Sequence, residues 1–273
     1  QMDNEVTRKS IEHSSVSIIV INTNEKRYRG GCLSSLLNQT YPNFEIIVVD
    51  ANSNDGTQEI VKSYAEKYKQ IKLFIHEGSR GEGRNFGVSK ARGDIIAFID
   101  GGCRADKNWL KELKKKMEEG FDVVAGKTVD VGPFKDIIHR VKVEYEGYDV
   151  TYPSCNLAYR KDLFEKIGGF DTRFVTAEDI DLNLRAVKAG AKIGYNENAV
   201  VYRRTAENLF SLIKQSFWYG YGRKQLALKH GSLWKQYSIT QTFSGHASVA
   251  GVIRLTFGLI GYVICGLSKK NMK

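Results

Sequence analysis

Two aspartates could contact a ligand, because each stands at the end of an apolar run of strand length. Asp50 ends one run, and Asp100 ends another that continues directly into Gly101 and Gly102. The carboxyl ends of parallel strands form the ligand-binding edge of an open α/β sheet, so we expect both carboxylates there. The two glycines let a ligand approach the backbone closely. Asp50 has a second interpretation, as a cap of the turn-rich segment that follows it.

A glycine-rich segment and an acidic pair are further candidates. Residues 78–85 form a predicted glycine-rich loop, whose Arg80 and Arg84 suit an anionic ligand, although its glycine spacing does not match the dinucleotide-binding fingerprint. Glu178 and Asp179 open a predicted helix, where the positive end of the helix dipole favours acids. A carboxylate at that position can also act as a general base if it faces the ligand.

Apolar strands that alternate with amphipathic helices must position these groups. The predicted strands are 16–21, 44–50, 71–76, 95–100, 121–125 and 193–202, and the predicted helices are 27–38, 57–69, 84–92, 107–119 and 178–189. Strands that are apolar throughout are typical of a parallel sheet covered by helices on both faces. We therefore predict a doubly wound α/β domain with right-handed crossovers.

Composition narrows the class of protein further. The 273 residues suffice for one large α/β domain with an appendage. Four widely separated cysteines argue against a disulfide framework or a zinc site and favour a reducing compartment. An N-terminal apolar region of the kind found in secretory signals is not visible.

Positive charge concentrates at the C-terminal end. From Arg203 onward the chain has eleven Lys or Arg residues and one acid, so this region accounts for the whole net charge of +10. Such an asymmetric distribution predicts an anionic partner. The charge adjoins an apolar stretch rather than a groove-reading motif, which argues against nucleic acid.

The apolar stretch covers residues 247–267 and would be about 30 Å long as a helix, which matches the hydrocarbon core of a bilayer. One face of this helix carries small or polar residues, namely Arg254, Gly258, Gly261 and Cys265. We expect this face to pack against another helix or chain while the apolar remainder faces lipid. The alternative is a buried helix of a soluble domain.

Five stretches occur in an order that is similar to a known family. They read VSIIVINTNE, CLSSLLNQTYPNFEIIVVDANSNDGT, GEGRNFGVSKARGDIIAFIDGG, SCNLAYRKDLFEKIGGFD and AEDIDLNLRAVKAG. The chain thereby resembles the family 2 glycosyltransferases from about Val16 to Tyr202. The resemblance implies the GT-A fold, a Rossmann-like α/β domain that binds a nucleotide-sugar. Together with the charge distribution and the apolar stretch, the extent of the resemblance divides the chain into an N-terminal extension (1–15), a catalytic domain (16–202) and a basic, amphipathic C-terminal region (203–273) that contains residues 247–267.

The resemblance also implies roles for individual residues. Asp179, next to Glu178, resembles the catalytic base that deprotonates the acceptor hydroxyl in an inverting transfer. Asp50 would recognise the nucleotide base. The residues expected to bind the donor are Asn22, Asn24, Glu25, Asp50, Arg80, Arg84, Asn85, Asp100, Gly101, Gly102, Arg203 and Arg204.

The metal site departs from the family pattern. The DxD element falls on residues 100–102, so that Gly102 stands where a second acid usually ligates a divalent metal. A histidine common after the last strand is replaced by Arg203 and Arg204. One hypothesis is that metal dependence is weakened and these arginines partly replace the ion. The other is that Asp100 still holds Mg²⁺ or Mn²⁺, with diphosphate and water completing the coordination.

Together these observations predict a membrane-associated glycosyltransferase with a cytoplasmic catalytic domain. It would move a sugar from a UDP- or GDP-sugar to a lipid-linked or cell-surface glycan, close to an anionic membrane surface. One alternative is a nucleotidyltransferase of similar architecture, but the residues after the first predicted strand do not form a basic, glycine-rich phosphate loop. The other is a non-catalytic sugar-nucleotide-binding protein with a degenerate DxD, against which the intact Glu178-Asp179 pair argues.

Overall fold

The computed structural model describes residues 14–136, 140–231 and 249–268. Most of the predicted N-terminal extension lies outside these residues. Also outside them are Trp234, Lys235, Lys269, Lys270 and Lys273 of the basic C-terminal region, and the first two residues of the apolar stretch.

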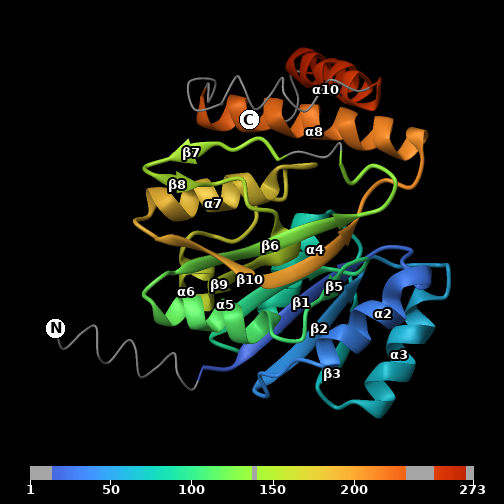
Figure 1. Cartoon of the computed structure of the whole chain (residues 1–273), viewed down its shortest axis with the longest axis vertical. Coiled ribbons are helices and arrows are strands. Elements are labelled where there is room, and N and C mark those ends of the chain that lie inside the picture. The colour runs from blue at the N-terminus through green and yellow to red at the C-terminus, as the bar shows by residue number, and fades with distance from the viewer. Residues whose placement is uncertain (1–13, 137–139, 232–248, 269–273) are drawn as a thin grey trace.

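A sheet of eight strands forms the centre of the molecule (Figure 1), in the order β3-β2-β1-β4-β9-β6-β10-β5. The strands are β1 (Val16–Asn22), β2 (Phe44–Asp50), β3 (Ile71–Ile75), β4 (Ile95–Asp100), β5 (Arg104–Ala105), β6 (Val123–Val131), β9 (Leu157–Arg160) and β10 (Ile193–Arg204). The pairs among β1, β2, β3 and β4 are parallel, and so is the pair of β6 and β10. The predicted α/β class with a mostly parallel sheet is confirmed.

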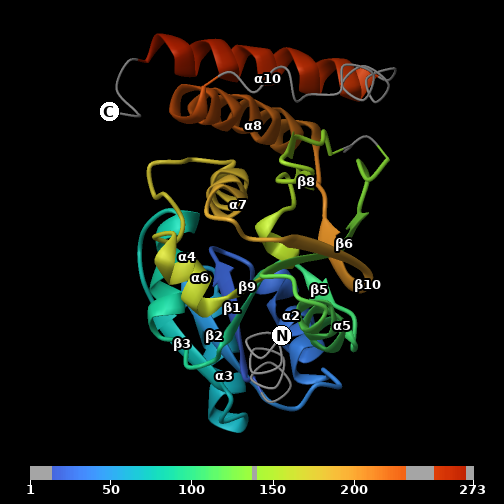
Figure 2. The same ribbon diagram turned by 90° about the vertical axis from the view of Figure 1, so that its left-hand side faces the viewer.

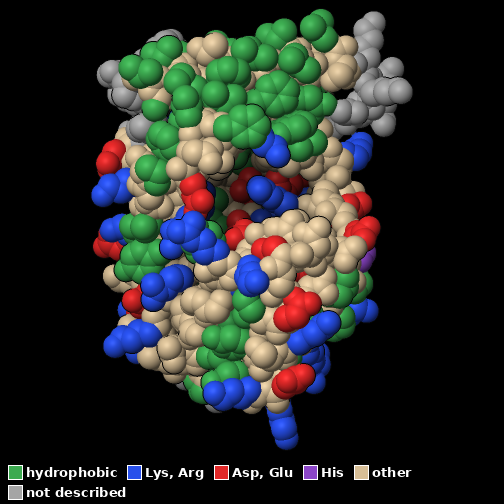
Figure 3. Space-filling model, turned by 90° about the vertical axis from the view of Figure 1, so that its right-hand side faces the viewer, with side chains coloured by type: hydrophobic (Ala, Val, Ile, Leu, Met, Phe, Trp, Pro, Cys, Tyr) green, Lys and Arg blue, Asp and Glu red, His purple; other side chains and the backbone are tan. Residues whose placement is uncertain are grey.

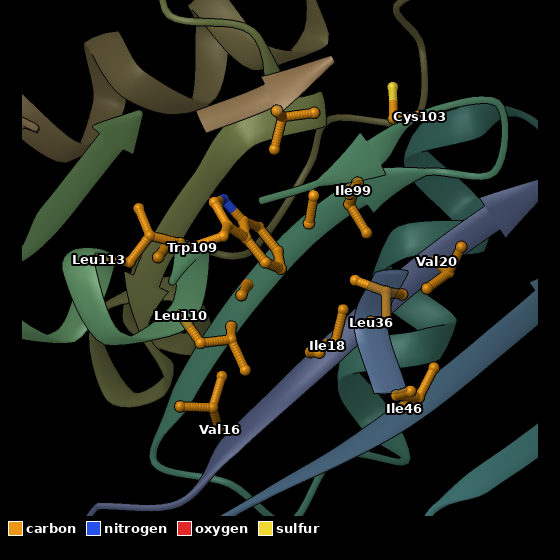
Figure 4. Packing of buried hydrophobic residues seen from close by; sticks show 14 of the residues in the cluster. Val16, Ile18, Val20, Leu36, Ile46, Ile99, Cys103, Trp109, Leu110 and Leu113 are labelled. Atoms are coloured by element: carbon orange, nitrogen blue, oxygen red, sulfur yellow. The ribbon is translucent and has the colours of Figure 1, made fainter. Parts of the chain in front are cut away.

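Helices cover both faces of the sheet. One face packs against α2 (Lys26–Leu37), α3 (Thr57–Lys67) and α5 (Trp109–Glu118). The other packs against α4 (Arg80–Ser89), α6 (Lys161–Lys166) and α7 (Glu178–Lys188). Figure 4 shows part of the first core, in which Ile18 and Val20 of β1 lie beside Leu36 of α2. Residues 16–20 of β1 are all buried, as expected for a strand with helices on both sides.

The start of α4 differs from the prediction. The segment predicted as a glycine-rich loop is helical from Arg80 onward, because Ser79 and Glu82 form a reciprocal capping box that satisfies backbone N–H groups of the first turn. The glycines of this segment allow α4 to pack closely on the sheet and do not form a flexible loop. A Cβ atom at Gly87 would lie only 2.6 Å from Cγ2 of Ile19, so α4 can pack directly on β1.

The region after residue 126 contains more strand structure than predicted. β6 continues to Val131, and β9 is an additional strand that runs antiparallel to both β4 and β6. The remaining short elements are the hairpin strands β7 (Glu144–Tyr145) and β8 (Tyr148–Asp149), and the 3₁₀ turn Ser154–Asn156. β9 is only four residues long, and so short an apolar run has little periodicity to reveal it.

Two long helices lie above α7, on the side of the molecule shown at the top of Figure 2. They are α8 (Leu209–His230) and α10 (Val249–Leu267). The predicted small-residue face of α10 is confirmed as a packing face, because a Cβ atom at Gly261 would lie 2.0 Å from the carbonyl oxygen of Phe217 in α8. Much of the rest of α10 is exposed, including Val252, Leu259 and Val263.

Candidate active site

A cleft of about 1210 Å³ lies between the carboxyl edge of the sheet and the two C-terminal helices. Figure 3 shows a hollow lined by acidic and basic side chains below an apolar cap. Nine of the predicted site residues line the cleft, namely Glu25, Arg80, Arg84, Asp100, Gly102, Glu178, Asp179, Arg203 and Arg204. Asn22, Asn24, Asp50, Asn85 and Gly101 are not among its lining residues.

Arg84 joins two acids that are far apart in the sequence. Its guanidinium donates through Nη1 to Glu178 (2.8 Å) and through Nη2 to Asp100 (2.9 Å). The Arg84 side chain is only 3% exposed and that of Glu178 only 6%, whereas that of Asp100 is 37% exposed. Arg84 therefore holds the ends of β4 and α7 together and leaves Asp100 open to the cleft.

Asp179 lies at the start of α7, with one oxygen accepting from the backbone N–H of Ile180 (2.9 Å) and the other from that of Ser154 (3.2 Å). Burial raises the pKa of the Asp179 carboxyl to about 6, and the negative charge of Glu178 acts in the same direction. Two fixed backbone donors orient the carboxylate. A carboxylate with a pKa near neutrality, at the wall of a cleft, has the properties of a general base.

The backbone immediately before this acidic pair is strained. Ala177 has a φ of 65°, in the left-handed region that costs energy for a residue with a Cβ atom. Helix α8 holds the segment in place, because Thr176 donates to the carbonyl oxygen of Trp218 (2.7 Å), and Gln225 accepts from the backbone N–H of Val175 (3.1 Å). Helix α8 therefore helps to position Glu178 and Asp179.

Asp50 is fully buried and its carboxylate is held by neighbouring side chains and backbone. It accepts from the backbone N–H of Ser53 (2.6 Å), from Oγ of the same residue (2.8 Å), from Gln58 (3.2 Å) and from Asn22. Asn24 accepts from the backbone N–H of Asn54 (3.1 Å). These contacts correspond to the turn-capping interpretation of Asp50, and recognition of the nucleotide base by Asp50 stays a prediction.

The other side chains predicted to bind the donor differ in how far they are engaged by groups of the protein itself. The amide of Asn85 is used at both ends by the backbone of Phe170 (2.8 and 2.9 Å), so it fixes the turn before α7. Arg203 forms a paired contact with Asp130 (2.8 and 3.1 Å), and the guanidinium of Arg204 lies 3.9 Å from the ring centre of Tyr28. Arg80 is exposed at the cleft, and within the described ranges it has no salt bridge.

Sequence reasoning missed several residues of the cleft. Tyr219 and Arg223 of α8, together with Arg254 and Tyr262 of α10, line it from above. The sequence signal was present, because the aromatic and basic residues of this region are interleaved. The apolar residues around them instead favoured a segment that contacts the membrane. In addition, no local sequence pattern indicates that α8 packs on the loop before Glu178.

The comparisons with known proteins identify the family. Residues 17–177 match the family described as "Glycosyl transferase family 2", and residues 139–267 match "Glycosyl transferase family group 2". The chain belongs to glycosyltransferase family 2. This glycosyltransferase is 28% identical over 231 residues to glycosyltransferase AglE of Haloferax volcanii, which corresponds to 77% of this chain and 73% of AglE.

A second relative is named for a lipid-linked acceptor. The glycosyltransferase is 27% identical over 240 residues to the dolichyl N-acetyl-alpha-D-glucosaminyl phosphate 3-beta-D-2,3-diacetamido-2,3-dideoxy-beta-D-glucuronosyltransferase of Methanococcus voltae. The match covers 79% of this chain and 74% of the relative.

Solved structures confirm the predicted GT-A fold. S. aureus TarS 1-349 in complex with UDP-GlcNAc superposes with a TM-score of 0.62 at 21% identity, covering 92% of this chain and 81% of that one. The mannosyltransferase PcManGT from Pyrobaculum calidifontis, in complex with GDP-Man and Mn²⁺, gives a TM-score of 0.60 at 16% identity, covering 98% and 83%.

The edge of the cleft presents two carboxylates, a type of group that binds divalent metals. Within the described residues no group of three or more His, Cys, Asp or Glu side chains could hold an ion. Asp100 and Glu25 both line the cleft, however, and Mg²⁺ is commonly held by one or two carboxylates together with substrate phosphates. When bound, such an ion would supply positive charge to the leaving diphosphate.

The pKa of Asp179 predicts the pH dependence of the enzyme. Only the ionised carboxylate can accept a proton, so kcat/KM should fall as the pH is lowered through about 6 and approach a decrease of about tenfold per pH unit below it. A pH–rate profile at acceptor concentrations well below KM measures this. A rate that stays flat well below that pKa would exclude Asp179 as the group whose ionisation limits the reaction.

Proposed function

We propose that the glycosyltransferase transfers a sugar from a UDP- or GDP-sugar to a hydroxyl of a lipid-linked or cell-surface glycan, with inversion at the anomeric carbon. The observation that carries this proposal is the position of Asp179. It is an oriented, half-buried carboxylate with a raised pKa, in the same cleft as the partly exposed carboxylate of Asp100.

The proposed reaction needs one proton transfer and one substitution. Asp179 accepts the proton of the acceptor hydroxyl while that oxygen forms a bond to the anomeric carbon. The bond from the same carbon to the diphosphate oxygen breaks, and the leaving diphosphate takes the electron pair. Arg80 is exposed at the cleft and would contribute positive charge near the diphosphate. Arg84 acts indirectly, by holding Asp100 and Glu178 in place.

The upper wall of the cleft favours an acceptor that is both anionic and apolar. Arg223 and Arg254 bring positive charge to this wall, and Leu255 and Leu259 bring apolar surface. A sugar on a polyprenyl phosphate or diphosphate carries both properties. The name of the Methanococcus voltae relative includes such an acceptor, a dolichyl phosphate derivative.

The apolar surface of α10 supports a location at the membrane. α10 has 19 residues with a mean hydropathy of 1.8, and it is the one helix in the described ranges that is long and apolar enough to cross a membrane. Exposed apolar side chains lie along it, among them Val252, Leu259 and Val263. We propose that this surface contacts lipid, that those basic residues of the C-terminal region that do not line the cleft contact anionic headgroups, and that residues 16–202 form a cytoplasmic catalytic domain.

A donor and acceptor screen tests the proposed function. The full chain is incubated with single UDP- and GDP-sugars, Mn²⁺ and a polyprenyl-phosphate-linked sugar, and the lipid products are analysed by mass spectrometry. We expect one nucleotide-sugar both to raise the thermal unfolding midpoint and to add one sugar to the lipid, because a ligand that binds the folded state stabilises it. Stabilisation by no nucleotide-sugar in the screen would contradict the proposal.

A further inference from the structure

The two glycines after Asp100 make room for side chains from the start of α2. A Cβ atom at Gly102 would lie 3.2 Å from Oε2 of Glu25, and 3.6 Å from both its carboxyl carbon and Oε1. The Glu25 carboxylate therefore lies beside the position where an acid at residue 102 would begin. Glu25 and Gly102 both line the cleft, so this carboxylate lies at the surface that a donor would contact.

The carboxylate of Glu25 lies near the buried charge of Arg29 but does not cap the helix that it precedes. It is the N-cap residue of α2, but its side chain makes no capping hydrogen bond. The backbone N–H of Glu25 donates to Oγ1 of Thr57 (2.9 Å), and this contact does not depend on the carboxylate. Asp100, the acid that precedes the two glycines, lines the cleft as well. Two carboxylates that repel each other at a cleft surface would be stabilised by a cation between them.

Arg29 fills the space beside the other glycine. A Cβ atom at Gly101 would lie 2.0 Å from Nη2 of Arg29, so a larger residue at 101 would displace the guanidinium. Arg29 is fully buried, and the nitrogens of its guanidinium have no hydrogen-bond partner in the described part of the chain. It is not among the residues that line the cleft. The charge of Arg29 therefore acts on Glu25 and Asp100 from the interior of the protein. Arg29 cannot bind the donor directly.

The arginines expected to replace the metal are engaged elsewhere. Arg203 is paired with Asp130, and Arg204 lies over the ring of Tyr28. The Asp130 carboxylate already balances the charge of Arg203, so this group adds little net positive charge to a diphosphate. A cation held by carboxylates is therefore the better supported of the two hypotheses.

We propose that Glu25 supplies, from the start of α2, the second carboxylate that the chain lacks at residue 102, so that Glu25 and Asp100 together hold a divalent cation on the donor diphosphate. This assignment rests on the proposed function, because the diphosphate belongs to the nucleotide-sugar. Two carboxylates with phosphate and water oxygens are a donor set that Mg²⁺ and Mn²⁺ accept.

Moving the carboxylate from residue 25 to residue 102 tests the proposal. Gly102 is not among the residues with positive φ, so an aspartate can occupy it without backbone strain. Thermal unfolding midpoints are measured with UDP or GDP, in the presence of Mn²⁺ or of a chelator. The variants are Glu25→Gln, Glu25→Ala and the double variant Glu25→Ala/Gly102→Asp, and the control is Glu59→Gln, an exposed acid on α3.

We expect Glu25→Gln and Glu25→Ala to fold and to bind Mn²⁺ at least about tenfold more weakly in the presence of nucleotide. The double variant should recover most of the Mn²⁺-dependent stabilisation, and the control should keep all of it. A parent chain that is stabilised by nucleotide with Mn²⁺, while Glu25→Gln is stabilised equally, would overturn the role of Glu25 and leave the proposed function intact. A parent chain that binds neither nucleotide would overturn both.

Discussion

Replacing Asp179 with asparagine should lower kcat by about 10²- to 10⁴-fold, the usual contribution of general acid–base catalysis. Asparagine has nearly the same shape and can still accept a hydrogen bond from the backbone of Ile180 or Ser154, but it cannot take a proton from the acceptor. Donor binding should stay nearly unchanged, because the amide oxygen keeps one of the two backbone hydrogen bonds and with it the position of the side chain. Initial rates and donor affinity from the unfolding midpoint separate the two effects.

A matched control for this variant is Asp162→Asn. Asp162 is an exposed acid in the first turn of α6, a position similar to that of Asp179 in α7 but outside the cleft. This variant should keep the parent rate. If Asp179→Asn retained kcat within a factor of about three while remaining folded, Asp179 would not be the base. Glu178, its neighbour at the cleft wall, would then be the next residue to test.

Replacing Arg84 with methionine should lower the free energy of unfolding by about 3–5 kcal/mol. Methionine keeps much of the side-chain length but leaves Glu178 as a buried acid without its ion-pair partner. Asp100 contributes less to this loss because it is more exposed. Urea unfolding monitored by tryptophan fluorescence measures the change, and activity should be lost as well, since Arg84 fixes Glu178 beside Asp179.

Two further variants separate charge from packing at this position. Arg84→Met/Glu178→Gln removes both charges and should recover a large part of the lost stability, because no unpaired buried charge remains. Arg80→Met changes an exposed arginine of the same helix and should alter stability by less than about 0.5 kcal/mol. A loss below about 1 kcal/mol for Arg84→Met would contradict the buried ion pair as a support of the site.

Helices and strands were predictable where the residues of one short segment are sufficient to identify the element. β1, β2 and β4 are apolar runs that end at the expected residues or within one of them, because a strand buried on both faces needs an unbroken apolar sequence. The start of α4 was also within reach, since Ser79 and Glu82 form a recognisable capping box. The number of glycines in that segment favoured a loop instead.

The site was predictable as a set of residues but not as a set of contacts. Arg84 is 94 residues away from Glu178, and no local pattern reports that their side chains meet. The approach of Glu25 to Gly102 likewise depends on how α2 packs against the end of β4. The sequence showed that an acid is absent at residue 102, whereas only the three-dimensional structure shows which carboxylate lies beside that position.

The stereochemistry of the product tests the central claim most directly. The nucleotide-sugar that stabilises the chain is used for transfer to a polyprenyl-linked acceptor, and the anomeric configuration of the new bond is determined by nuclear magnetic resonance. Direct attack by an acceptor deprotonated by Asp179 predicts a single product whose configuration is inverted relative to the donor. A product that retains the donor configuration would contradict the role of Asp179 as a general base.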